Sequence, residues 1–174
     1  MLDFLTTTKH EEQRVGVFVD VQNLYYSARN IYNSRVNFSS LLKETVEKRK
    51  LIRAIAYVIR AQMPEEQTFF DALTKSGFEV KAKDLQVFFG GIKKGDWDVG
   101  ITMDIIKMLN KLDTIVLASG DGDYAPLLEY VKNFGARVEV IAFGKSASNR
   151  LVEEADDFID MDNAPKKFLI PIKK

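Results

Sequence analysis

Short apolar runs alternate with longer amphipathic stretches along most of the chain. Four runs are mostly apolar and rich in β-branched residues, at 15–20, 52–59, 114–119 and 136–143. Runs of this kind predict strands that are buried on both faces of a sheet. Weaker patterns predict more exposed strands at 78–83 and 158–161, and the segment 86–89 would pair with 78–83 or extend it.

The stretches between these strands carry apolar residues at helical spacing. Helices are therefore predicted at 22–33, 38–48, 64–76, 98–111, 124–134 and 148–155. Pro64 suits the first turn of its helix, and Gly77 suits the end of it. Because strands and helices alternate, we expect an α/β fold: one doubly wound domain with a mainly parallel sheet that helices cover on both faces.

A length of 174 residues fits one domain with a full hydrophobic core. We expect this domain at 15–162, after an N-terminal arm at 1–14. A C-terminal tail at 163–174 follows, rich in proline and lysine. Its apolar segment FLIPI is expected to dock on a neighbouring surface, and it would also allow the chain to form a homo-oligomer.

The composition excludes several kinds of site and partner. The chain has no cysteine, which rules out disulfides, thiolate zinc sites and a cysteine nucleophile. We see no signal peptide and no apolar run near the ~18 residues of a membrane span, so we expect a cytoplasmic protein with no membrane contact. The 25 basic and 25 acidic residues cancel, so any contact with nucleic acid must come from a local patch.

Three aspartates follow the ends of two predicted strands. Asp20 is the last residue of the strand 15–20, and Asp121 and Asp123 come just after the strand 114–119. If these strands are neighbours in a parallel sheet, ~4.8 Å apart, the three carboxylates meet at one edge. Carboxylates that close repel one another unless protons or cations neutralise them, and an all-oxygen site favours a hard ion such as Mg²⁺ or Mn²⁺.

A fourth aspartate begins the helix predicted at 98–111. Asp98 lies within about 40° of the centre of the apolar stripe of this helix, so its carboxylate faces the sheet. Asp104 lies at the side of the same stripe. We expect it to form a hydrogen bond with a backbone group or Asn23 rather than to be a metal ligand itself. Each acid also has a purely structural interpretation, such as Asp123 capping a helix. Their convergence on one edge favours the metal site.

Three segments together resemble the NYN domain family, in its LabA-like branch. They are FVDVQNL at 18–24, KGDWDVGITMD at 94–104 and SGDGDYAPLLEYVKNFG at 119–135. The segment SASNRLVEEADDFIDM at 146–161 is similar to the C-terminal element of that family. The segments span most of the chain in the order of the family, and the resemblance implies a PIN-like fold within the PIN-like nuclease superfamily.

The resemblance implies a metal-dependent ribonuclease that hydrolyses RNA phosphodiester bonds. Its catalytic and metal-binding residues would be Asp20, Asp98, Asp121 and Asp123, with Mg²⁺ or Mn²⁺ as cofactor. Asn23 and Asp104 match two further polar positions of the family and would act beside the ligands rather than as ligands. The partner would be RNA, either single-stranded or structured.

Substrate contacts are expected from polar and cationic side chains around the same edge of the sheet. The residues predicted to make them are Asn23, Lys94, Ser119, Lys145, Ser146 and Arg150. Four rings are candidates for stacking on the bases of a single strand, although packing is the more frequent role of such rings. They are Tyr25, Tyr26, Trp97 and Tyr124.

Three other functions compete with a nuclease. Catalytic activity is not general in the family, so the alternative is a catalytically weak or inactive fold that binds RNA or a protein partner. An aspartyl-phosphate phosphatase is disfavoured, because that chemistry needs a second acid two residues after Asp20, where Gln22 stands. A dinucleotide-binding enzyme is disfavoured because no GxGxxG motif follows the first strand.

Overall fold

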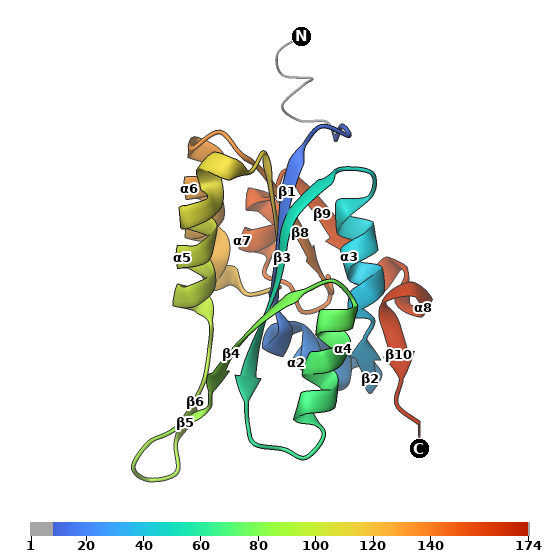
Figure 1. Cartoon of the computed structure of the whole chain (residues 1–174), viewed down its shortest axis with the longest axis vertical. Helices are drawn as coiled ribbons and strands as arrows, with labels where there is room; N and C mark the ends of the chain where they lie inside the picture. Colours follow the sequence, from blue (N-terminus) through green and yellow to red (C-terminus); the bar gives the residue numbers. More distant parts are fainter. Residues whose placement is uncertain (1–8, 174) are drawn as a thin grey trace.

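A six-stranded sheet forms the centre of the computed structural model, which describes residues 9–173. Every neighbouring pair is parallel, in the order β4–β3–β1–β7–β8–β9 (Figure 1). The strands are β1 (Arg14–Asp20), β3 (Lys50–Arg60), β4 (Glu79–Asp84), β7 (Thr114–Ala118), β8 (Arg137–Ala142) and β9 (Asp157–Asp160). The predicted α/β fold is confirmed, and the sheet is parallel throughout.

The order in which the chain visits the strands reverses beside β1. The chain first moves outward from β1 through β3 to β4, and then returns to β7 on the other side of β1 before it reaches β8 and β9. Such a reversal opens a crevice at the carboxyl ends of the two central strands, because their connections leave in opposite directions. Val19 of β1 pairs with Ala118 of β7, so the next residues, Asp20 and Ser119, emerge together at this edge.

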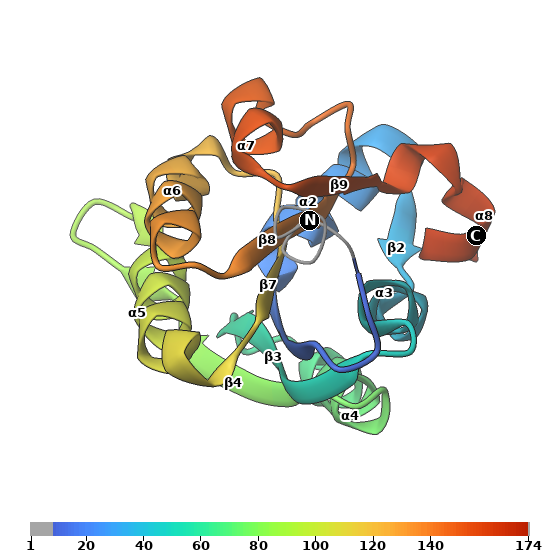
Figure 2. The ribbon, with the colours of Figure 1, turned by 90° about the horizontal axis from the view of Figure 1, so that it is seen from above.

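Helices cover both faces of the sheet. One face carries α2 (Val21–Tyr32), α3 (Phe38–Val46) and α4 (Glu66–Lys75), and the other carries α5 (Asp98–Met108), α6 (Ala125–Asn133) and α7 (Asn149–Glu154). A 3₁₀ turn, η1 (Leu109–Lys111), completes the helix predicted at 98–111. Figure 2 shows α5 and α6 on the opposite side of the sheet from α3. Within the described residues, no helix is long and apolar enough to cross a membrane.

The side chains of the central strands enter two separate cores. Val17 and Val19 of β1 lie in the core beneath α2 and α3, whereas Phe18 lies in the core beneath α5 and α6. All three side chains are completely buried. The continuous apolar character of this strand follows from burial on both faces.

A small hairpin leaves the sheet between β4 and α5. Its two antiparallel strands are β5 (Gln86–Val87) and β6 (Lys93–Lys94). The prediction that 86–89 would pair with the strand 78–83 or extend it is therefore wrong. The chain turns back at Gly90 and Gly91, whose positive φ angles would strain any residue with a side chain. Figure 1 shows the hairpin projecting beyond the rest of the molecule.

The C-terminal tail folds back onto its own chain. The elements involved are η3 (Met161–Asn163), α8 (Pro165–Phe168), β10 (Leu169–Pro171) and β2 (Ser34–Val36), of which β10 and β2 pair antiparallel. The Phe168 ring is buried, and the Phe168 carbonyl accepts a hydrogen bond from the N–H of Asn37 at 2.7 Å. The surface on which FLIPI docks is thus β2 of the same chain, and a homo-oligomer stays a prediction.

Candidate functional site

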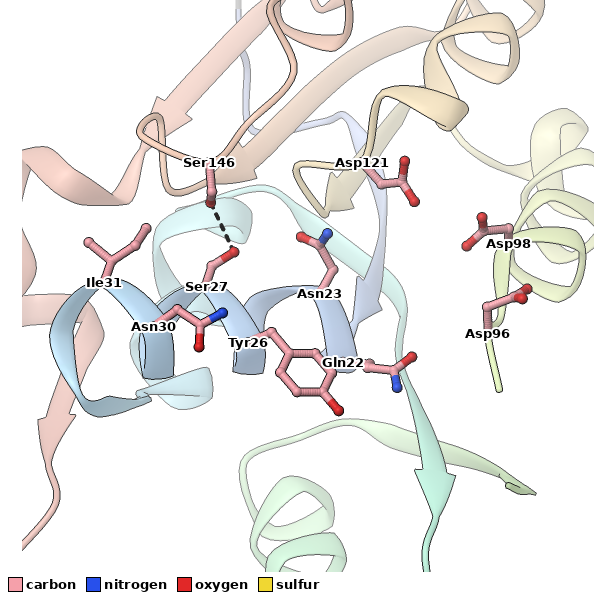
Figure 3. A pocket seen from close by; sticks show the side chains of 10 residues that line it. All are labelled: Gln22, Asn23, Tyr26, Ser27, Asn30, Ile31, Asp96, Asp98, Asp121 and Ser146. Atoms are coloured by element: carbon pink, nitrogen blue, oxygen red, sulfur yellow. Dashed lines mark hydrogen bonds between the residues drawn. The ribbon is translucent and has the colours of Figure 1, made fainter. Parts of the chain in front are cut away.

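Three carboxylates meet at the carboxyl edge of the sheet. One oxygen of each of Asp98, Asp121 and Asp123 lies within 4.8 Å of the others. Asp98 begins α5, whereas Asp121 and Asp123 belong to the turn after β7, which contains η2 (Gly122–Tyr124). Figure 3 shows the side chains of Asp98 and Asp121 pointing toward each other from these two elements. Three of the four predicted ligands are therefore brought together.

Asp20 lies behind this three-acid cluster and is only 8% exposed. Its Oδ1 atom caps α2 by accepting a hydrogen bond from the N–H of Asn23 at 3.2 Å. Its Oδ2 atom accepts from the hydroxyls of Ser119 at 3.4 Å and Tyr124 at 3.5 Å. The Tyr124 hydroxyl also lies 3.1 Å from Asp98 Oδ1. The same hydroxyl therefore contacts both carboxylates, and the distance from Asp20 Oδ2 to Asp98 Oδ1 cannot exceed the sum of the two contacts.

Tyr124 connects the two sides of the site. Its side chain is 1% exposed, and burial raises the pKa of its hydroxyl well above the usual range, with the charges of Asp20 and Asp98 adding to the rise. The hydroxyl therefore stays protonated and donates to the acids. The hypothesis that this ring stacks on a base is wrong, because the ring is enclosed in the core beneath α5 and α6.

The acids of the site repel one another. Burial raises the pKa of Asp20 to about 6; the charges of Asp98 and Asp121 add to the rise, while hydrogen bonds from Asn23 and Ser119 oppose it. Burial also raises the pKa of Asp98, against the hydrogen bond from Tyr124. Among residues 9–173, no lysine, arginine or histidine forms an ion pair with any of the four aspartates. The site therefore carries negative charge that the described chain does not neutralise.

The raised pKa of Asp20 predicts how the metal-free protein responds to pH. The folded state holds this proton up to about pH 6, whereas the unfolded chain releases it near the ordinary aspartate pKa of 3.8. Stability from Asp20 is therefore present below pH 4 and is lost as pH rises to about 6. Asn at position 20 can still cap α2 but never ionises, so Asp20→Asn should gain up to about 3 kcal/mol over the wild type at pH 7.5.

Urea unfolding in EDTA at pH 4 and pH 7.5 measures this difference. As pH rises from 4 to 7.5, the free energy of unfolding of the wild type should fall relative to that of Asp20→Asn. Carboxylates away from the site titrate equally in both proteins, so the comparison isolates Asp20 and its coupling to Asp98 and Asp121. Parallel pH profiles for the two proteins would contradict a raised pKa.

The turn after β7 is built for close approach to the loop after β8. Asp121, rather than Asp123, caps η2, because its Oδ1 accepts a hydrogen bond from the N–H of Asp123 at 3.0 Å. A Cβ atom on Gly122 would lie 2.6 Å from Ser148 Oγ, so only glycine fits between the two carboxylates without a shift. The N–H of Ser148 also donates to the carbonyl of Gly120 at 2.9 Å. These contacts fix the separation of Asp121 and Asp123.

Asp104 has different partners from those expected. Its Oδ2 accepts hydrogen bonds from the Tyr57 hydroxyl at 2.9 Å and from Lys81 Nζ at 2.7 Å, in place of a backbone group or Asn23. Burial opposes the shift, but these two bonds lower the pKa of Asp104. Asp104 thus joins α5 to β3 and β4 and supports Asp98 only by holding their shared helix.

Trp97 is an anchor rather than a free ring. Its indole N–H donates to the carbonyl of Val58 at 2.8 Å, and its ring centroid lies 5.2 Å from that of Tyr57. Lys83 Nζ lies 4.7 Å from the centroid of the Trp97 ring. The ring therefore fastens the start of α5, with Asp98, to β3.

Asn23 and Ser146 line a pocket beside the acids, whereas Ser119 is completely buried, and contact of these three residues with a substrate stays a prediction. The side-chain oxygen of Asn23 accepts a hydrogen bond from the N–H of Gly120 at 2.9 Å, and the Ser119 hydroxyl accepts one from Asp121 at 3.2 Å. Both side chains thus hold the turn that carries the acids. Ser146 is exposed and bonds Ser27 on α2 at 2.9 Å.

The three predicted cationic contacts lie outside the pocket beside the acids. Lys94 is exposed on β6, and Arg150 is exposed on α7. Lys145 Nζ lies 5.0 Å from the centroid of the Tyr32 ring and donates to the Tyr32 hydroxyl at 3.3 Å. Their contact with a substrate stays a prediction.

A polar pocket of about 480 Å³ adjoins the three-acid cluster. Figure 3 shows α2 along one wall, with Ser146 and Asp121 across from it and Asp96 and Asp98 at one end. The sequence analysis missed five lining residues as site residues: Gln22, Ser27, Asn30, Ile31 and Asp96. Gln22 and Asn30 lie on the face of α2 opposite its buried residues, so a polar helix face beside the predicted carboxyl edge was the available signal, whereas Ile31 packs against the core.

Sequence comparison places these elements in a family. The sequence profile of the NYN domain matches residues 14–162. The chain belongs to the NYN domain family. This NYN domain is 24% identical over 161 residues to the low amplitude and bright protein LabA of Synechococcus elongatus, and the match covers 86% of this chain and 84% of LabA. The predicted resemblance to the LabA-like branch is confirmed.

A solved structure has the same fold as this NYN domain. It is the crystal structure of VPA0982, a protein of unknown function from Vibrio parahaemolyticus RIMD 2210633, with a TM-score of 0.84. The two sequences are 32% identical, and the superposition covers 94% of this chain and 99% of VPA0982. The NYN match contains all four aspartates of the site.

Proposed function

We propose that this NYN domain is a metal-dependent ribonuclease that hydrolyses RNA phosphodiester bonds. The single observation that carries the proposal is the cluster of Asp98, Asp121 and Asp123 at the carboxyl edge of the sheet, with Asp20 behind it. The PIN-like nuclease family to which the domain belongs supports the reaction class, and RNA as substrate follows from the LabA-like resemblance.

The acids fit Mg²⁺ or Mn²⁺ in chemistry and in charge. All the donors are carboxylate oxygens, which hard divalent ions prefer over the nitrogen and sulfur ligands typical of zinc. Burial is the main cause of the raised pKa values of Asp20 and Asp98, and repulsion between the acids, which a cation would relieve, adds to it. When bound, such an ion supplies the positive charge that makes water acidic and stabilises charge on a phosphate.

Each residue of the site then has a defined task. Asp98, Asp121 and Asp123 would hold the ion at the open side of the crevice, and Asp20 would add a fourth carboxylate from the floor. Tyr124 and Ser119 hold the Asp20 carboxylate by hydrogen bonds. The neighbouring polar pocket, lined by amide, hydroxyl and tyrosine groups of α2, is suited to a nucleotide beside the bond that is cut.

Removal of the metal is the direct test. We expect the protein to cleave single-stranded or structured RNA in Mn²⁺ or Mg²⁺ and to lose all cleavage in EDTA, because the acids alone cannot activate water. Denaturing gel electrophoresis of end-labelled RNA measures cleavage, and DNA of the same sequence tests substrate class. Metal binding should also stabilise the fold. At a metal concentration one hundred times the dissociation constant, the free energy of unfolding should rise by about 2.7 kcal/mol, and the melting temperature should rise with it.

Two outcomes would contradict the proposal in different ways. Cleavage that persists in EDTA would point to a contaminating nuclease. Binding of RNA without cleavage in either metal would favour the alternative, a catalytically inactive fold that acts as an RNA- or protein-binding module. Asp71→Gln serves as a stability control, because Asp71 is exposed on α4 and bonds only Gln67 among the described residues.

A further inference from the structure

The tip of the hairpin exposes an unusual concentration of apolar side chains. Val87, Phe88, Phe89 and Ile92 are 65%, 49%, 105% and 67% exposed. The turn itself is ordered by hydrogen bonds, since the N–H of Phe88 donates to Ile92 at 2.7 Å and the N–H of Gly91 donates to Phe88 at 3.1 Å. Contiguous apolar surface of this kind on a soluble protein marks a contact site.

Lysines lie directly beside this apolar tip. Lys93 and Lys94 form β6, and both are exposed. Among residues 9–173 neither side chain has a hydrogen bond or an ion pair. The nearest acid before the hairpin, Asp84, already pairs with Arg60. The hairpin therefore presents two aromatic rings and two uncompensated positive charges.

The hairpin is continuous with the candidate active site. After β6 the chain passes Asp96, which lines the polar pocket, and reaches Asp98 of the three-acid cluster. Five residues lie between Ile92 and Asp98, so the tip is at most about 20 Å from the acids along the chain. A single strand of a few nucleotides can span this distance.

We propose that this hairpin binds single-stranded RNA that extends from the active site, with Phe88 and Phe89 stacking on bases and Lys93 and Lys94 contacting phosphates. Aromatic rings beside cations are the combination that holds single strands without reading their sequence. The proposal rests on the proposed function for the identity of the strand. It adds a contact that lies away from the acids and the polar pocket.

Charge favours a polyanion over a second copy of the chain. In a twofold symmetric dimer the same patch meets itself, so Lys93 and Lys94 of each copy would approach those of the other. Such like charges repel, whereas the phosphates of a nucleic acid neutralise them. Each hairpin strand is also only two residues long, which leaves little backbone edge for pairing with another strand.

The test compares RNA binding by the wild type and by Phe88→Ala/Phe89→Ala. Fluorescence anisotropy with a fluorescein-labelled oligouridine of about 12 nucleotides, in EDTA, measures affinity without cleavage. The double variant should bind at least about tenfold more weakly, the loss expected when one base loses its aromatic partner. Both rings are exposed, so circular dichroism and the melting temperature should be unchanged.

Phe134→Ala is the matched control, because Phe134 is an aromatic ring 57% exposed at the opposite edge of the sheet. It should bind the oligouridine like the wild type. Equal affinity of the double variant and the wild type, or no binding by the wild type, would overturn the hairpin proposal. So would a wild-type dimer, seen by light scattering, that the double variant converts to monomer with unchanged RNA affinity.

The hairpin and the catalytic proposal fail separately. If the wild type binds oligouridine through the hairpin but never cleaves RNA in Mn²⁺ or Mg²⁺, the hairpin contact stands and the nuclease proposal falls. If the wild type cleaves RNA and the double variant cleaves and binds equally well, the nuclease stands and the hairpin contact falls. Cleavage of a dinucleotide, too short to reach the tip, should be equal in both proteins.

Discussion

Asp98→Asn should lower the rate of RNA cleavage in Mn²⁺ by at least about 100-fold. The substitution keeps the shape of the side chain and removes one of the three charges that lie within 4.8 Å of one another. Loss of about 3 kcal/mol of transition-state stabilisation, a typical value for one electrostatic group at a reacting centre, corresponds to that factor. Single-turnover cleavage of end-labelled RNA measures the rate.

Asp98 suits this test because its structural role is smaller than that of Asp20 or Asp121. Asp20 caps α2 and Asp121 caps η2, so changing either also disturbs a turn. The carboxylate of Asp98 contacts only the Tyr124 hydroxyl among the described residues, and an amide can still accept that bond. Asp98→Asn should therefore fold normally and melt no lower than the wild type in EDTA.

Asp71→Asn provides the matched control for this experiment. It also changes an aspartate to asparagine, but at an exposed position on α4, where the Asp71 side chain bonds only Gln67 among the described residues. Its cleavage rate should equal that of the wild type. If Asp98→Asn cleaves RNA within about threefold of the wild type while Asp71→Asn behaves normally, Asp98 is not a ligand, and the three-acid site is wrong.

The sequence was most informative where a general rule about parallel sheets applied. Asp20 and Asp121 were placed at one edge because each follows a buried strand, and the carboxyl ends of parallel strands share an edge. That β1 and β7 are neighbours was an assumption, since strand order depends on packing between distant segments. The prediction that Asp98 joins the other acids used the same assumption, together with the helical pattern that placed Asp98 on the side facing the sheet.

Details that depend on the third dimension could not be predicted. The bond between Asp104 and Lys81 joins α5 to β4, and no spacing in the sequence connects these two residues. Whether the Tyr124 ring is buried or exposed depends on its orientation at the end of the 3₁₀ turn η2. The helical spacing of apolar residues does not contain this information. The hairpin strands are two residues long, too short for any alternation of polar and apolar positions.

The tail shows the same limit. FLIPI was correctly recognised as a segment that needs a surface, because its apolar residues would otherwise face water. Its partner, β2, is only three residues long, so its sequence pattern does not identify it as a strand that could pair with the tail. Non-local pairing of short strands is settled by the packing of Phe168 rather than by local pattern.

Glu139→Gln should destabilise the protein by about 3–5 kcal/mol, the usual result of removing one partner of a buried ion pair. Glu139 on β8 is completely buried, and its two oxygens accept hydrogen bonds from Arg49 at 2.8 Å each. Arg137 donates a further bond to the same carboxylate at 2.8 Å. Glutamine keeps the shape but leaves the Arg49 charge, whose side chain is 2% exposed, without its carboxylate.

The melting temperature should accordingly fall by roughly 6–20 °C for a protein of this size. Glu79→Gln is the matched control, because Glu79 also lies on a strand and pairs with an arginine, Arg53, but its side chain is 49% exposed. Exposed pairs contribute about 0.2–1 kcal/mol, so this variant should melt within about 4 °C of the wild type. Because Glu139 lies toward the amino end of β8, away from the four aspartates, Glu139→Gln that remains folded should retain cleavage. Equal melting temperatures for the two variants would mean that the buried carboxylate contributes no more than an exposed one.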